Sequence, residues 1–171
     1  MGKTKDKDIK TNAMRILDKM KIKYKIITYE CNEFISGVVT AQKRGADIRK
    51  SYKTLVAQGK SNEYYVLVLP VAEEIDLKKA AKVLNEKSVE MIPVKDIQKV
   101  TGYIRGGCSP LGMKKQYKTV IQSGVEQYDT ICISGGRIGS TIELSPMDLQ
   151  KATNAEFDDF IQTHKEEQTF N

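Results

Sequence analysis

The sequence predicts an α+β fold built around a mixed, largely antiparallel sheet, and two observations lead to this class. Segments with strand and helix patterns alternate irregularly along the chain. The β-rich runs at 51–58 and 63–70 are joined by a short link that contains a glycine, which is typical of a hairpin. The 171 residues contain no internal repeat, linker or low-complexity tract, so we expect a single domain over 1–171.

The first half of the chain predicts two amphipathic helices and the hairpin. Ile9, Ala13, Ile16, Leu17 and Met20 recur at helical spacing, which predicts a helix over 8–20. Asp76 is positioned to cap a second helix that begins at LKKAAKVL. Between them we expect a strand at 24–30 and a short helix at 38–45 that ends at Gly45.

The second half predicts further strands and three short helices. A helix over 94–102 should end at Gly102, and Pro146 suits the first turn of a helix that begins at PMDLQKAT. The segment NAEFDDFIQ predicts a last short helix. Strands are expected at 118–123, 129–134 and 141–145, and flexible ends at 1–7 and 164–171.

Composition excludes several classes of function. No apolar run approaches the roughly 18 residues of a membrane span, and the charged start MGKTKDKDIK lacks the apolar region of a secretion signal, so we expect a cytoplasmic protein. The three cysteines are widely spaced and His164 is the only histidine. A histidine-based metal site, a Ser-His-Asp triad and a bound cofactor are therefore not expected.

Charge is distributed unevenly along the chain. The net charge is +6, residues 1–25 alone carry +6, and residues 155–171 carry −4. A basic body with an acidic tail suits a phosphate-rich partner, because lysines that neutralise phosphates release counterions. The alternative is a solvated lysine-rich surface, and Lys3, Lys5 and Lys7 fit either reading.

Lys53 is the first candidate for chemistry, because it stands inside a predicted strand. Alternation places it on the same face as Leu55 and Ala57. A lysine among apolar neighbours is partly desolvated and holds its ammonium at a defined point for an anionic or carbonyl group. The alternative is an edge-strand lysine that prevents aggregation.

Two glycine-rich segments are the other candidates. In TGYIRGGCSPLGMKK, 101–115, glycines let the backbone approach a ligand, whereas Cys108 or Ser109 as a nucleophile would need a base that the sequence does not supply nearby. ISGGRIG, 133–139, follows a strand and is either an oxyanion-binding turn or a plain hairpin turn. Tyr29 ends the first strand and either presents its hydroxyl in a cleft or covers the core.

The segments SYKTL, LKKAAK, VEM, TGYIRGGCSPLGMKK and ISGGRIG occur in this order, and together they resemble the YbaK/EbsC family. These proteins are free-standing relatives of the editing domain inserted in bacterial prolyl-tRNA synthetase. The resemblance covers nearly the whole chain and is greatest to the YbaK-type deacylases of Cys-tRNA(Pro). It implies a twisted, mixed, partly barrel-like sheet flanked by helices, and a trans-editing aminoacyl-tRNA deacylase.

The resemblance also implies a site. Lys53 falls on the family's essential strand lysine, which we expect to orient the aminoacyl ester or the terminal adenosine. The tyrosine that ends the first strand corresponds to Tyr29. The residues implied to bind the substrate are Tyr29, Thr54, Gly106, Gly107, Cys108, Ser109, Pro110, Ser134, Gly135 and Gly136, together with Phe34.

Two departures from the family concern the pocket. Relatives carry a phenylalanine between Tyr29 and Lys53, and in CNEFISGVV either Phe34 takes that role or Ser36 occupies its place. Relatives usually carry an aliphatic residue where Cys108 stands, which favours a packing role for this cysteine.

For Cys-tRNA(Pro), the resemblance implies that the substrate's own thiol attacks the ester and forms a cyclic thiolactone. It also implies a protein without metal or cofactor that binds the 3′ end of aminoacyl-tRNA and acts beside prolyl-tRNA synthetase. Two alternatives stay open. One is a deacylase for another small amino acid such as alanine, and the other is a non-enzymatic regulator that binds tRNA or protein.

Overall fold

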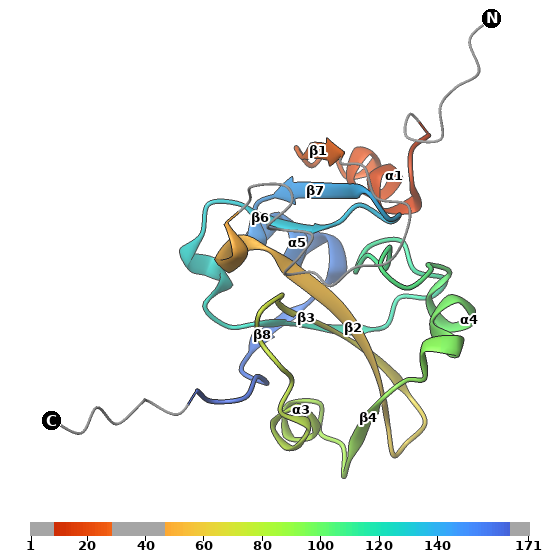
Figure 1. The fold of residues 1–171 in the computed structure, drawn as a ribbon, viewed down its shortest axis with the longest axis vertical. Coiled ribbons are helices and arrows are strands. Elements are labelled where there is room, and N and C mark those ends of the chain that lie inside the picture. Colours follow the sequence, from red (N-terminus) through yellow and green to blue (C-terminus); the bar gives the residue numbers. More distant parts are fainter. Residues whose placement is uncertain (1–8, 29–46, 165–171) are drawn as a thin grey trace, which may run out of the picture.

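The computed structural model describes residues 9–28 and 47–164, so the helix expected at 38–45 and residues 1–7 lie outside the described residues. Figure 1 shows two sheets with helices on both sides. The strands are β1 Lys25–Thr28, β2 Tyr52–Gly59, β3 Tyr64–Pro70, β4 Val89–Met91, β5 Lys118–Gln122, β6 Ile131–Ser134, β7 Ser140–Leu144 and β8 Glu156–Asp158. The helices are α1 Asn12–Lys19, α3 Leu77–Val83, α4 Ile97–Thr101 and α5 Pro146–Thr153, with 3-10 turns η2 Ile48–Lys50, η3 Val94–Asp96 and η4 Val125–Gln127.

The sheets confirm the predicted α+β class and the mixed, mainly antiparallel pairing. The larger sheet has the order β4-β2-β3-β5-β8, and the smaller has the order β1-β7-β6. The predicted hairpin is present as the antiparallel pair β2–β3, whereas β3–β5 and β5–β8 are parallel. In the described part of the chain the two sheets are not closed into a barrel, and an isolated bridge between Ser51 and Cys132 joins them.

The helix ends follow the capping chemistry predicted from the sequence. The side chain of Asp76 accepts hydrogen bonds from the backbone N–H groups of Lys78 and Lys79 at the start of α3. Gly102 has a φ of +87° and ends α4 in the left-handed conformation that glycine adopts readily. Pro146 is the first residue of α5, as expected.

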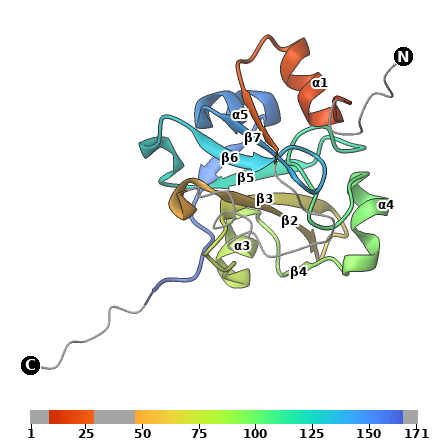
Figure 2. The ribbon, with the colours of Figure 1, turned by 45° about the horizontal axis from the view of Figure 1, so that its top comes forward.

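The core lies on both faces of the larger sheet. Val66 and Val68 of β3 belong to a cluster with residues of α1 and the smaller sheet, whereas Leu67 and Leu69 pack with Ala80 and Ala81 of α3. Alternation along β3 therefore supplies both clusters from one strand. Figure 2 shows the resulting layers, with α1 and α5 on one side of the sheets and α3 on the other.

The last short helix predicted in NAEFDDFIQ is wrong, because this segment forms β8. Asn154 ends α5 with a φ of +55°, and Glu156 then pairs in parallel with Val120 of β5. Phe160 is fully buried, and its backbone N–H donates to the side-chain oxygen of Gln122 at 2.9 Å. Sheet pairing and burial of one aromatic ring outweigh the local preference for helix.

We expect Phe160→Ala to lower the free energy of unfolding by about 3–5 kcal/mol, because a fully buried aromatic side chain would leave a cavity. Urea titration followed by circular dichroism measures this loss. The exposed Met147→Ala, on α5, is the control and should change stability by less than about 0.5 kcal/mol. Equal stability of the two variants would contradict the role of Phe160 as the anchor of the C-terminal segment.

Candidate functional site

A cavity of about 370 Å³ lies between β2, the start of β7 and the loop that follows α4. Its size falls in the range of small-ligand pockets. The predicted residues that line it are Lys53, Thr54, Gly106, Cys108 and Ser134. The cavity therefore brings together three segments that lie far apart in the sequence.

The cavity exists because β2 is paired unevenly along its two edges. One edge pairs with β3 from Tyr52 to Gln58, whereas the other pairs with β4 only from Ala57 to Gly59. The bridge from Ser51 to Cys132 holds the start of β2 against β6. Residues 51–56 all line the cavity. The cavity therefore runs along the stretch of β2 between these two attachments.

Lys53 lies on the strand face that the sequence predicts. It is opposite Leu69 in the β2–β3 register, as Leu55 is opposite Leu67, so its neighbours on that face are apolar. The Lys53 side chain is 23% exposed, and its Nζ lies 3.9 Å from a carboxylate oxygen of Glu74, which is 75% exposed. This long pair with an exposed carboxylate leaves an ammonium available to an anionic or carbonyl ligand.

Two hydroxyl groups on the cavity wall have no hydrogen-bond partner within the described residues. They are Oγ1 of Thr54 on β2 and Oγ of Ser140 on β7, and both atoms are buried. Buried polar atoms are normally paired, so an unpaired hydroxyl beside a cavity is suited to a polar ligand group. Ser140 was not predicted from the sequence, although it directly follows the glycine-rich turn.

The loop after α4 contributes backbone more than side chains. Gly106 lines the cavity with a φ of +85°, in the left-handed region that favours glycine. A Cβ on Gly107 would lie 2.9 Å from the Cα of Arg137, so this glycine lets the loop pack against the second glycine-rich turn. Ser109 is fully buried and Pro110 borders a separate cavity of about 110 Å³, so the structure does not place these two at the main cavity.

The turn at 134–136 places only its first residue on the cavity wall. Ser134 lines the cavity, and its Oγ accepts a hydrogen bond from the backbone N–H of Gly136 at 3.2 Å. A Cβ on Gly135 would lie 2.6 Å from Oγ of Ser140, and Gly136 has a φ of +98°. Both glycines therefore shape the turn rather than line the cavity.

Cys108 has the properties of a packing residue. It is half-buried against Val56, Ile92 and Val100. Burial raises the pKa of the Cys108 thiol to about 11, and a hydrogen bond with Thr101 offsets part of this effect. The thiol is therefore protonated at neutral pH, whereas a nucleophilic cysteine requires the thiolate.

We expect alkylation of Cys108 by iodoacetamide to be slow at pH 7 and to accelerate about tenfold per pH unit towards pH 9.5, because only the thiolate reacts. Peptide-resolved mass spectrometry separates Cys108 from Cys31 and Cys132. Cys108→Ala should keep the activity of the protein within about threefold of wild type. Rapid alkylation at pH 7 together with an inactive Cys108→Ala would instead identify a nucleophile.

The predicted site and the residues that line the cavity differ at several positions. Tyr29 and Phe34 lie outside the described residues. His164, expected in a flexible end, places Nε2 at 2.6 Å from a Glu73 carboxylate oxygen and does not line the cavity. Sequence reasoning missed the small residues Cys132, Ser140 and Thr141, and the apolar residues Met91, Ile92, Val94 and Ile97.

The described residues contain no group of three or more His, Cys, Asp or Glu side chains that could hold a metal ion. Within the same residues, no helix is long and apolar enough to cross a membrane. The cavity thus offers an ammonium, small hydroxyls and closely approaching backbone on an apolar floor. This combination suits a small ligand that carries an anionic or carbonyl group and a few hydrogen-bonding groups.

Comparisons with known proteins identify a family and a shared fold. The model of a family described as "Aminoacyl-tRNA editing domain" matches residues 37–152. An Enterococcus faecalis protein named "Putative Cys-tRNA(Pro)/Cys-tRNA(Cys) deacylase EbsC" is 42% identical over 149 residues, which are 86% of this chain and 91% of the relative. The Bacillus subtilis protein YwhH is 23% identical over 111 residues, or 65% of this chain and 70% of the relative.

A solved structure described as "a putative trans-editing enzyme for prolyl tRNA synthetase" superimposes with a TM-score of 0.76. The match covers 91% of this chain and 99% of that chain at 19% sequence identity. At this level of identity, the match establishes a shared fold.

Proposed function

Since this chain belongs to the aminoacyl-tRNA editing domain family, we propose that it is a trans-editing deacylase that cleaves the aminoacyl ester of mischarged Cys-tRNA(Pro). The observation that carries the proposal is the cavity lined by Lys53, Gly106 and Ser134 together. The name of the 42% identical relative supports the choice of cysteine.

The chemistry of proline selection supports a need for such an enzyme. Cysteine and proline are similar in size, and a small apolar pocket separates such pairs by only about 1–3 kcal/mol. A second site that hydrolyses the wrong ester restores accuracy. The proposal places the protein in the cytoplasm, beside prolyl-tRNA synthetase and without a cofactor, with the 3′ end of aminoacyl-tRNA as its ligand.

In the proposed reaction, the Lys53 ammonium binds the ester region or the terminal adenosine. The Gly106 backbone closes one side of the pocket, and the hydroxyls of Thr54 and Ser140 hydrogen-bond polar groups of the substrate. The other proposed contributors to the substrate site are Tyr29, Phe34, Cys108 and Ser134. Gly107, Ser109, Pro110, Gly135 and Gly136 are proposed to contribute indirectly, by shaping the two glycine-rich segments that border the cavity.

The bond changes use the substrate's own sulfur. The cysteinyl thiol attacks the ester carbonyl, a carbon–sulfur bond forms, and the bond from the carbonyl carbon to the ribose oxygen breaks. The thiol proton ends on that ribose oxygen, which leaves as the free tRNA hydroxyl. Water then opens the thiolactone to cysteine. A protonated Cys108 and a buried Ser109 are compatible with this route, because it requires no protein nucleophile.

A panel of aminoacyl-tRNAs tests the proposal. Purified protein should release cysteine from Cys-tRNA(Pro) much faster than it releases alanine or proline from the same tRNA. S-methylcysteinyl-tRNA(Pro) should resist cleavage, because its sulfur cannot attack and lose a proton. Rapid cleavage of the S-methyl substrate would exclude the thiolactone route, and no cleavage of any substrate would overturn the enzyme assignment.

A second candidate is a deacylase for alanine on tRNA(Pro). The altered segment around Phe34 and the small residues Cys132, Ser134 and Ser140 on the cavity wall favour it. In the same panel, a higher kcat/KM for Ala-tRNA(Pro) than for Cys-tRNA(Pro) would select this candidate. Adding prolyl-tRNA synthetase to both reactions tests the proposed partnership.

A further inference from the structure

We propose that the acceptor stem of tRNA docks on an exposed basic surface beside the cavity, formed by Arg15, Lys99, Arg105, Lys114 and Lys115. This inference rests on the proposed function and extends it to the part of the substrate outside the cavity. All five side chains are exposed. They come from α1, α4 and the loop that follows α4.

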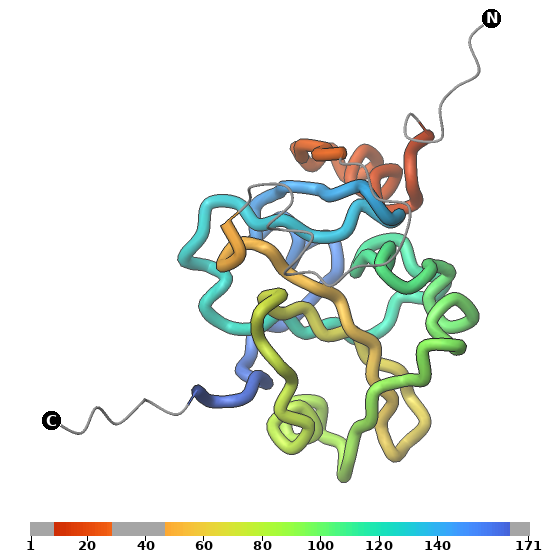
Figure 3. The backbone as a smooth tube through the Cα atoms, in the orientation of Figure 1, coloured from red at the N-terminus to blue at the C-terminus, as the bar shows by residue number. Residues whose placement is uncertain are grey.

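The residues of the basic surface come together because the loop packs on both helices. Nζ of Lys114 donates to the backbone oxygen of Lys99 at 3.2 Å, which joins the loop to α4. A Cβ on Gly112 would lie 2.8 Å from the backbone of Asn12, which joins the loop to the first residue of α1. Figure 3 shows this green loop beside the red segment that begins α1.

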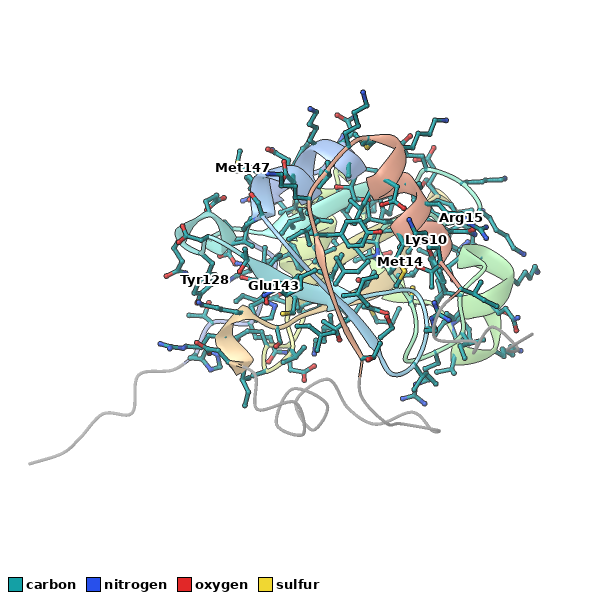
Figure 4. The ribbon with its side chains drawn as sticks, turned by 90° about the horizontal axis from the view of Figure 1, so that it is seen from above. Lys10, Met14, Arg15, Tyr128, Glu143 and Met147 are labelled. Carbon is teal, nitrogen blue, oxygen red and sulfur yellow. The ribbon has the colours of Figure 1, made fainter. Side chains whose placement is uncertain are left out.

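The direction of α1 brings Arg15 to the same end of the molecule. Arg15 lies one turn beyond Asn12, and its Nη1 donates to the Asn12 side-chain oxygen at 3.4 Å. Figure 4 labels Lys10 and Arg15 on the side of α1 towards the green α4. Figure 2 also places α1 and α4 at one end of the sheets.

Four of the charges on this surface form no ion pair within the described residues. Among the ion pairs of residues 9–28 and 47–164, none includes Arg15, Lys99, Lys114 or Lys115. Lys10 is left out of the surface because Asp18 pairs with it. Phosphates are the natural partner of such a surface, since each neutralised phosphate releases counterions regardless of base sequence.

The position of the cavity indicates the path by which the tRNA leaves it. Arg105 and Gly106 line the cavity and also belong to the loop that carries Lys114 and Lys115, so the basic surface begins at the cavity. Near Lys53 stands the acidic Glu74. A 3′ end seated in the cavity therefore leaves past the loop and α4, where the charge is favourable, and not past Glu74.

The test compares two variants with the same change of charge. One is Lys99→Ala/Lys114→Ala/Lys115→Ala, and the control is Lys78→Ala/Lys82→Ala/Lys87→Ala, whose lysines are exposed on and after α3. The first should raise the Kd for uncharged tRNA and the KM for Cys-tRNA(Pro) at least tenfold. It should also reduce the slope of log Kd against log salt by about 2, since each lost phosphate contact removes roughly 0.7–0.9.

A small substrate separates this inference from the proposed function. Both variants should cleave cysteinyl-adenosine at the wild-type rate, because that ester lacks the acceptor stem. If wild type binds tRNA through this surface but cleaves neither ester, the proposed function fails and the docking surface stands. Equal Kd values for the two variants, no tRNA binding by wild type, or a loss seen only in affinity for prolyl-tRNA synthetase would overturn the docking surface.

Discussion

Lys53→Ala is expected to lower kcat/KM for Cys-tRNA(Pro) at least about 100-fold, the usual effect of removing one positioned charge that stabilises a transition state. The structural reason is that Lys53 combines an apolar strand face, 23% exposure and only a distant pair with Glu74 at 3.9 Å. The melting temperature should change by less than about 2 °C, since a 3.9 Å pair with a carboxylate that is 75% exposed contributes little to stability.

Lys118→Ala is the matched control, because Lys118 also stands in the larger sheet and lies 4.0 Å from a single carboxylate, that of Glu156. It does not line the cavity and should keep wild-type activity. A Lys53→Ala protein that is folded and as active as the Lys118→Ala protein would remove Lys53 from the proposed mechanism. Lys53→Arg tests whether charge alone suffices or whether a compact ammonium is needed.

The second large effect is expected from Gly106→Val, which should reduce kcat/KM by about two orders of magnitude or more. Gly106 lines the cavity at a φ of +85°, a region that a β-branched residue occupies only with strain of about 1–3 kcal/mol. The new side chain would also shift the backbone that shapes the pocket. Single-turnover deacylation together with the melting temperature measures both consequences.

Gly124→Val is the control that separates the effect of backbone strain from the effect of a position at the cavity. Gly124 has a φ of +95°, and a Cβ there would meet no heavy atom closer than 3.6 Å. It precedes η4 and does not line the cavity. Both valine variants should lose similar stability, but only Gly106→Val should lose activity. Equal loss of activity in the two would mean that Gly106 matters through general stability alone.

Much of the secondary structure follows from local sequence. Thr11, Asp76 and Ser145 each cap a helix with a side-chain oxygen, and Gly102 ends α4, because these positions require specific residue types. The hairpin β2–β3 follows from two β-rich runs and a short link. The structure of the C-terminal segment did not follow from local sequence, because β8 forms by pairing with a strand more than 30 residues earlier in the chain.

The sequence likewise predicted only part of the candidate site. Alternation alone placed Lys53 with Leu55 and Ala57 on one face of β2. Pattern could not show that Gly106 lines the cavity while Gly107 packs on Arg137. Nor could it find Ser140, whose hydroxyl is a candidate only because folding buries it beside the cavity without a partner among the described residues.

The sequence by itself determined the class of fold, the helix ends at Asp76, Gly102 and Pro146, the hairpin and the family resemblance, since each depends on residues close together in the chain or on an ordered series of motifs. It placed the start of the first helix at residue 8, whereas α1 begins at Asn12 after its cap Thr11. Only the tertiary structure decided where the cavity lies. The cavity depends on β2 being attached to β6 at Ser51 and to β4 from Ala57 onwards. The packing of one loop against α1 likewise places Arg15 on the same surface as Lys114 and Lys115. Their charges act together there, because electrostatic interaction depends on separation in space and not along the chain.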